Sequence, residues 1–132
     1  LDGIDPTTLN RRPLGGEWSI RDVVMHLSDN ETVEAVRFRM VVAGDGETLP
    51  TFDRELWKRR LHYLWRDPEA ALSLFQQTRY GTAEMLRQCD RESWQRVGAC
   101  PKLGEVTLAD LLWKAADHSE AETARIRDFR GG

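Results

Sequence analysis

A histidine and a glutamate one helical turn apart interrupt an apolar pattern near the end of this 132-residue chain. His118 and Glu122 lie at positions i and i+4, a spacing that places two side chains on one face of an α-helix. Such a pair can offer two ligands to one metal ion, as paired ligands on helices do in zinc enzymes. A hydrogen-bonded pair on a helix surface has the same spacing. The spacing alone is therefore compatible with either a metal site or a hydrogen-bonded pair on the helix surface.

Further polar residues stand on or beside apolar helical faces. Glu31 and Arg79 each lie within an apolar stripe, and His26 lies beside the stripe of Glu31. A buried ionised group costs several kcal/mol unless it is paired or bound to a metal. We therefore expect Arg79 to be buried and paired with Glu31 or Glu122, although its stem can also follow the core edge with the guanidinium in water. His26 is equally compatible with an ordinary hydrogen-bonded histidine.

Helix-starting signals mark the elements that must position these residues. Ser19 followed by Asp22, and Thr107 followed by Asp110, have the spacing of a capping box, and an Asp-Pro pair marks a third start. No stretch alternates at period two, so the chain is predicted to be all-α. The predicted helices cover about 19–42, 53–65, 68–89 and 107–129, with a connector at 1–17 and a loop at 99–106.

Composition limits the class of protein. The chain is 40% hydrophobic and 31% charged, which suits one folded domain over residues 1–132. Its net charge is −3, with basic and acidic residues interleaved, so nucleic acid is not an expected partner. No apolar run reaches the roughly 18–20 residues of a membrane span, and no signal peptide is recognisable. We expect no membrane partner and a cytoplasmic location.

Several segments in order resemble one known family. They read GGEWSIRDVVMHLSDNE, RFRM, TFDRELW, ALSLFQQTR and VTLADLLWKAADHSEAETARI. Together they resemble the DinB-like superfamily, particularly its YfiT-like branch, over about residues 12–127. The resemblance implies a four-helix bundle that is commonly dimeric and holds nickel or zinc with three histidines. Two of these match His26 and His118, whereas the third falls on Glu122.

The change of the third ligand leaves two outcomes open. Two histidines and a carboxylate form known catalytic zinc sites, so His26, His118 and Glu122 can still hold a divalent metal. Alternatively, Glu122 pairs with Arg79 or with a protonated histidine, and the site holds no metal.

The resemblance also implies an activity. It points to a metal-dependent hydrolase, or to a transferase that moves a low-molecular-weight thiol onto a small-molecule substrate. Asp29, Glu31 and Arg79 are then the candidate catalytic residues, and Arg37 is the candidate for binding an anionic substrate or a thiol cofactor. The alternative is a metal-free, non-catalytic module for small-molecule binding or dimerisation.

The resemblance also implies a helix ahead of the segment that contains GEWS. Residues 1–17 resemble the end of that helix and the loop after it. Three long helices leave an apolar groove, so we expect either about 20 further N-terminal residues or a partner subunit to cover it. A homodimer is expected in both cases.

Overall fold

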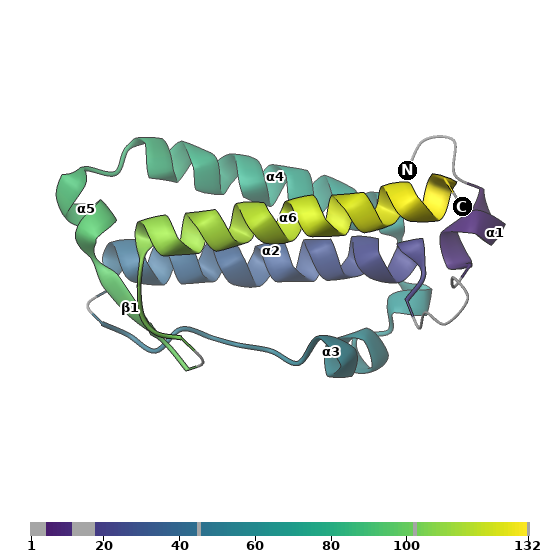
Figure 1. Ribbon diagram of the computed structural model, residues 1–132, viewed down its shortest axis with the longest axis horizontal. Helices are drawn as coiled ribbons and strands as arrows, with labels where there is room; N and C mark the ends of the chain where they lie inside the picture. The colour runs from purple at the N-terminus through teal and green to yellow at the C-terminus, as the bar shows by residue number, and fades with distance from the viewer. Residues whose placement is uncertain (1–4, 12–17, 45, 102, 132) are drawn as a thin grey trace.

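Three long helices lie side by side in the computed structural model (Figure 1). They are α2 (Ile20–Ala43), α4 (Pro68–Arg87) and α6 (Leu108–Gly131), and α2 packs against both others. The structure describes residues 5–11, 18–44, 46–101 and 103–131, without the side chains of 119, 123 and 125–131. The shorter helical elements are α1 (Pro6–Asn10), α3 (Arg54–Arg60), the 3₁₀ turn η1 (Tyr63–Trp65) and α5 (Arg91–Gln95). The prediction of an all-α class is confirmed.

The predicted helix starts are present as hydrogen-bonded caps. The Ser19 hydroxyl accepts from the Asp22 N–H at 3.2 Å, and the Asp22 carboxylate accepts from the Ser19 N–H at 3.0 Å. The same exchange links Thr107 and Asp110 at 3.1 and 2.9 Å. Each box satisfies two backbone N–H groups that a helix end otherwise leaves without partners. These local bonds fix where α2 and α6 begin.

The predicted loop at 99–106 is wrong. The segment forms an antiparallel hairpin of β1 (Val97–Cys100) and β2 (Gly104–Thr107), with Gly98 opposite Val106. The chain after α2 runs alongside, where the Leu49 N–H donates to the Ala99 carbonyl at 2.8 Å. Strands of four residues are too short to show alternation in the sequence, which is why the pattern missed them.

The amphipathic piece predicted at about 53–65 is divided in two. α3 ends at Arg60, and His62 adopts a left-handed conformation with φ 54° before η1. A right-handed α-helix needs a negative φ at every residue, so a continuous helix cannot pass through His62. Nothing in the local sequence marks the break.

Apolar residues gather in two clusters, towards opposite ends of α2. One joins the start of α2 to Tyr63 and Ala71, and the other joins its end to the hairpin and the start of α6. Between them the buried face of α2 is polar and carries His26, Asp29 and Glu31. Polar side chains on facing helices inside a bundle are the groups from which metal sites are built.

The stripe on α6 buries Leu111, Ala115 and Glu122 as expected, whereas the side chains of Ile126 and Phe129 lie outside the described residues.

Within the predicted connector, the structure describes residues 5–11, which contain the short helix α1, and the rest lies outside the described part. In that part, no helix is long and apolar enough to cross a bilayer.

Candidate metal centre

His26 from α2 meets His118 and Glu122 from α6 between the two apolar clusters. The Nε2 atoms of His26 and His118 are 3.1 Å apart, and His118 Nε2 is 3.6 Å from Glu122 Oε1. One ligand atom from each of the three residues lies within 4.8 Å of the others. The expected convergence of these side chains is therefore seen in the structure.

Aromatic rings hold His26 in place. The Trp18 indole packs against its ring in a T-shaped arrangement at a centroid distance of 5.6 Å, and Phe52 lies 6.0 Å away on the loop after α2. Trp18 is itself fixed by its indole N–H, which donates to Glu55 Oε1 at 2.6 Å. His26 is 3% exposed, so its ring has little freedom to turn away from the cluster.

The donor set fits a divalent transition metal. Two nitrogens bound to one tetrahedral zinc at 2.0–2.1 Å lie about 3.3 Å apart, which is close to the observed separation of the two Nε2 atoms. A carboxylate completes the two-histidine, one-carboxylate set of known catalytic zinc sites. Glu122 is 4% exposed, and a carboxylate buried to this extent needs a cation or hydrogen bonds nearby. Small side-chain shifts would bring all three ligand atoms to one ion.

An open cleft reaches the cluster from solvent. It has a volume of about 710 Å³ and is lined by His26 and His118 together with Arg37, Phe52 and Arg54, among others. A neighbouring cleft of about 530 Å³ shares His118 and Arg37 and continues between the hairpin and α6 along apolar side chains that include Leu103, Val106 and Leu111. A small molecule can thus lie beside the histidines with an apolar part against the hairpin.

Arg37 is held firmly at the wall that the two clefts share. Its Nε donates to the Pro50 carbonyl at 2.8 Å, and its Nη1 forms an ion pair with Glu34. Burial raises the pKa of the Glu34 carboxyl, and the nearby guanidinium opposes that rise. The guanidinium is thus held at the cleft wall by a backbone carbonyl and by the Glu34 carboxylate.

The other predicted site residues lie elsewhere. Asp29 accepts two hydrogen bonds from Arg66, both at 2.8 Å, and Glu31 pairs with Arg79 at 3.0 Å. Neither acid lines the two clefts beside His118; Glu31 and Arg79 line a separate hollow of about 250 Å³ between α4 and α6. The structure therefore does not bring Asp29, Glu31 and Arg79 to the open side of the His26–His118–Glu122 cluster.

The predicted pairing of Arg79 with Glu31 is confirmed, but its predicted burial is wrong. The Arg79 side chain is 40% exposed, and its guanidinium lies over the Phe75 ring at 4.7 Å. Long cationic side chains commonly lie along an apolar surface in this way while the charge stays hydrated.

We expect Arg79→Met to lower the free energy of unfolding by about 1–2 kcal/mol, because Glu31 is buried and loses a partner. The loss is below the roughly 3–5 kcal/mol typical of a fully buried pair, since water screens the exposed guanidinium. Urea denaturation measures it. The double variant Glu31→Leu/Arg79→Met should recover part of the loss, and an unchanged midpoint in the single variant would contradict the pairing.

Three residues near the His26–His118–Glu122 cluster were not predicted. Asn30 lies 3.4 Å from His118 Nδ1, and Glu34 lines the apolar cleft. Both follow His26 on α2 at helical spacings of four and eight residues, so the periodicity contained the signal. Phe52 comes from an irregular loop, and no local pattern indicates its position.

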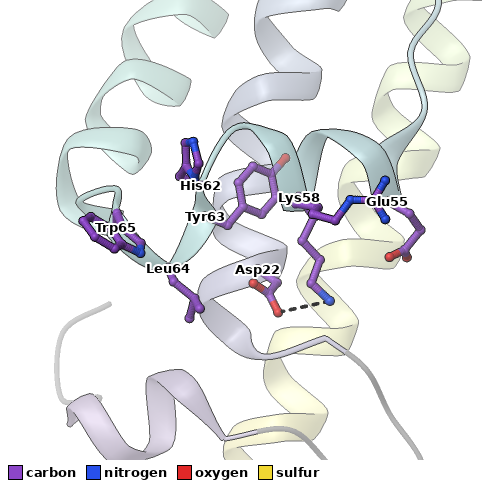
Figure 2. Close-up of a pocket in the computed structure, with 8 residues that line it drawn as sticks. Asp22, Glu55, Lys58, His62, Tyr63, Leu64 and Trp65 are labelled. Atoms are coloured by element: carbon purple, nitrogen blue, oxygen red, sulfur yellow. Dashed lines mark ion pairs between the residues drawn. The ribbon is translucent and has the colours of Figure 1, made fainter.

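A further pocket, of about 400 Å³, opens where α3 and η1 pass the start of α2 (Figure 2). Its buried carboxylate, Asp22, is already engaged, since it caps α2 and pairs with Lys58 Nζ at 3.8 Å. The ion pair of Lys58 with Asp22 thus ties α3 to α2. This link keeps Glu55 beside Trp18, which packs against His26, so the pocket supports the histidine site structurally.

The chain is similar in sequence to proteins of one known family. The family model of the DinB superfamily matches residues 1–121. The "Putative metal-dependent hydrolase YfiT" of Bacillus subtilis is 25% identical over 115 residues, which cover 86% of this chain and 65% of that protein. A similarly named protein of Bacillus licheniformis is 24% identical over 120 residues, covering 87% of this chain and 66% of the relative. The chain thus spans about two thirds of the length of these relatives.

A solved structure shares the fold. Its title is "YfiT from Bacillus subtilis is a probable metal-dependent hydrolase with an unusual four-helix bundle topology". It superposes with a TM-score of 0.88 at 23% identity, over 96% of this chain and 73% of that one. The predicted four-helix-bundle fold class is confirmed by this likeness.

Proposed function

Because the chain belongs to the DinB superfamily, we propose that it acts as a divalent-metal-dependent hydrolase of small molecules. The ligands are His26 Nε2, His118 Nε2 and the Glu122 carboxylate. The observation that carries the proposal is the 3.1 Å approach of two imidazole nitrogens beside a buried carboxylate. Nickel and zinc are the proposed metals, since imidazole suits both.

A metal held by three protein ligands supplies Lewis-acid chemistry and activates a nucleophile at its open position. The residues of the chain bind and orient the substrate. Arg37 binds an anionic group of the substrate, and the apolar wall of the second cleft takes the remaining part. Phe52 and Trp18 pack against the His26 ring and keep water from the parts of the ring that they cover.

The test compares nickel- or zinc-loaded protein with chelator-treated protein on a panel of small esters and amides, with and without a carboxylate. We expect hydrolysis by the loaded protein alone, with a lower KM for the anionic substrates. Equal rates with and without metal would contradict the proposal. A protein that binds neither metal would instead be the non-catalytic binding module.

Thiol transfer is the second candidate, and the open cleft of about 710 Å³ that Arg37 and the two histidines line favours it. An anionic low-molecular-weight thiol fits there with its charge on the guanidinium. Consumption of an electrophile such as a chlorinated nitrobenzene that depends on both metal and added thiol would support transfer over hydrolysis.

A further inference from the structure

Asn30 reaches from α2 to the outer nitrogen of His118. Its amide Nδ2 lies 3.4 Å from His118 Nδ1, on the opposite side of the ring from the cluster. Among the described residues, the Asn30 side chain makes this one hydrogen-bonding contact. The inner nitrogen, Nε2, faces His26 and Glu122. Asn30 therefore contacts the nitrogen that does not face the ligand atoms.

The partner of Nδ1 decides which nitrogen of His118 carries the proton. A neutral imidazole has one N–H and one lone pair, and a metal needs the lone pair. For Nε2 to bind a metal, Nδ1 must carry the hydrogen and donate it to an acceptor. The Asn30 amide, whose Nδ2 lies 3.4 Å from Nδ1, carries an oxygen that can be that acceptor.

The amide can serve both tautomers. With Nδ2 towards the ring, it donates to Nδ1, and the ring proton sits on Nε2 and points at the cluster. With the amide turned by half a revolution, Oδ1 occupies nearly the same place and accepts from Nδ1–H. Because the oxygen and the NH₂ group are similar in size, the turn needs little extra space. The lone pair of Nε2 is then free for a metal.

We propose that Asn30 is a positioning residue of the metal site, which turns its amide to hold His118 in the metal-binding tautomer. It donates to Nδ1 in the metal-free protein and accepts from it in the loaded protein. This inference rests on the proposed metal-binding function. An aspartate at this position accepts only and favours the metal-binding tautomer throughout, whereas a leucine favours neither.

The test compares wild type, Asn30→Asp and Asn30→Leu in two measurements. Zinc affinity is measured by competition with a chromophoric chelator. We expect Asn30→Leu to weaken binding about 10–100-fold, the usual effect of losing such an outer partner, and Asn30→Asp to bind at least as tightly as wild type. The ¹⁵N shifts of His118 in metal-free protein should place the proton on Nε2 in wild type and on Nδ1 in Asn30→Asp.

A matched variant separates added charge from hydrogen bonding. Thr51→Asp also puts a carboxylate on the wall of the open cleft that holds His26 and His118. It should leave the His118 tautomer unchanged, and its zinc affinity should not exceed that of Asn30→Asp.

Two results would overturn the role of Asn30. One is an unchanged zinc affinity in Asn30→Leu with an unchanged unfolding midpoint. The other is the same His118 tautomer in wild type and Asn30→Asp. A wild-type protein that binds no zinc would refute the proposed function instead, while the tautomer comparison still decides whether Asn30 sets the proton position.

Discussion

His118→Ala should abolish the binding of zinc and nickel while leaving the fold intact. Its Nε2 is the atom shared by both close contacts of the cluster, at 3.1 Å to His26 and 3.6 Å to Glu122. Without it, one ligand remains on each of two helices, and affinity should fall by more than the roughly 10–100-fold of a lost outer partner. The side chain is 31% exposed and belongs to neither apolar cluster, so little packing is lost.

Isothermal titration with zinc and circular dichroism measure binding and folding in the same sample. His62→Asn is the matched control, because His62 is exposed on the α3–η1 segment and asparagine tolerates its left-handed conformation. The control should bind zinc like wild type. Tight binding by His118→Ala would show that the metal is held elsewhere.

Glu122→Gln should remove the stabilisation that zinc gives to the native protein. Metal present at 100 times its Kd stabilises a native state that alone binds it by about 2.7 kcal/mol. The glutamine keeps the volume of the buried side chain but has no charge to attract the ion, and amide oxygens are poor ligands for zinc compared with carboxylates. The gain should therefore fall to near zero in the variant.

Unfolding midpoints with and without zinc measure this gain. Glu120→Gln is the control, because Glu120 lies two residues earlier on α6 and is exposed. It should keep the full stabilisation. If zinc raises the midpoint of Glu122→Gln as much as that of wild type, Glu122 is not a ligand.

Local signals explain the parts of the fold that could be predicted. The capping boxes at Ser19 and Thr107 involve residues three apart, so the sequence alone locates them. The hairpin depends on pairing between short strands and with the segment after α2, and these contacts leave no local pattern. The left-handed residue His62 likewise depends on its surroundings, since histidine does not demand this conformation.

The same distinction applies to the site. His118 and Glu122 were visible as an i, i+4 pair, whereas placing His26 with them required the order of segments that resembles the DinB-like superfamily. The partners of Asp29 and Glu31 come from residues 37 and 48 positions away, Arg66 and Arg79. Because helical periodicity names a face but not what packs on it, the sequence could not show that these acids were already engaged.

Anomalous diffraction from crystals soaked in zinc or nickel tests whether His26, His118 and Glu122 together hold one divalent metal. We expect a single strong peak within about 2.0–2.2 Å of His26 Nε2, His118 Nε2 and a Glu122 carboxylate oxygen. A protein without a peak at this position, or with one that Glu122 does not touch, would contradict it.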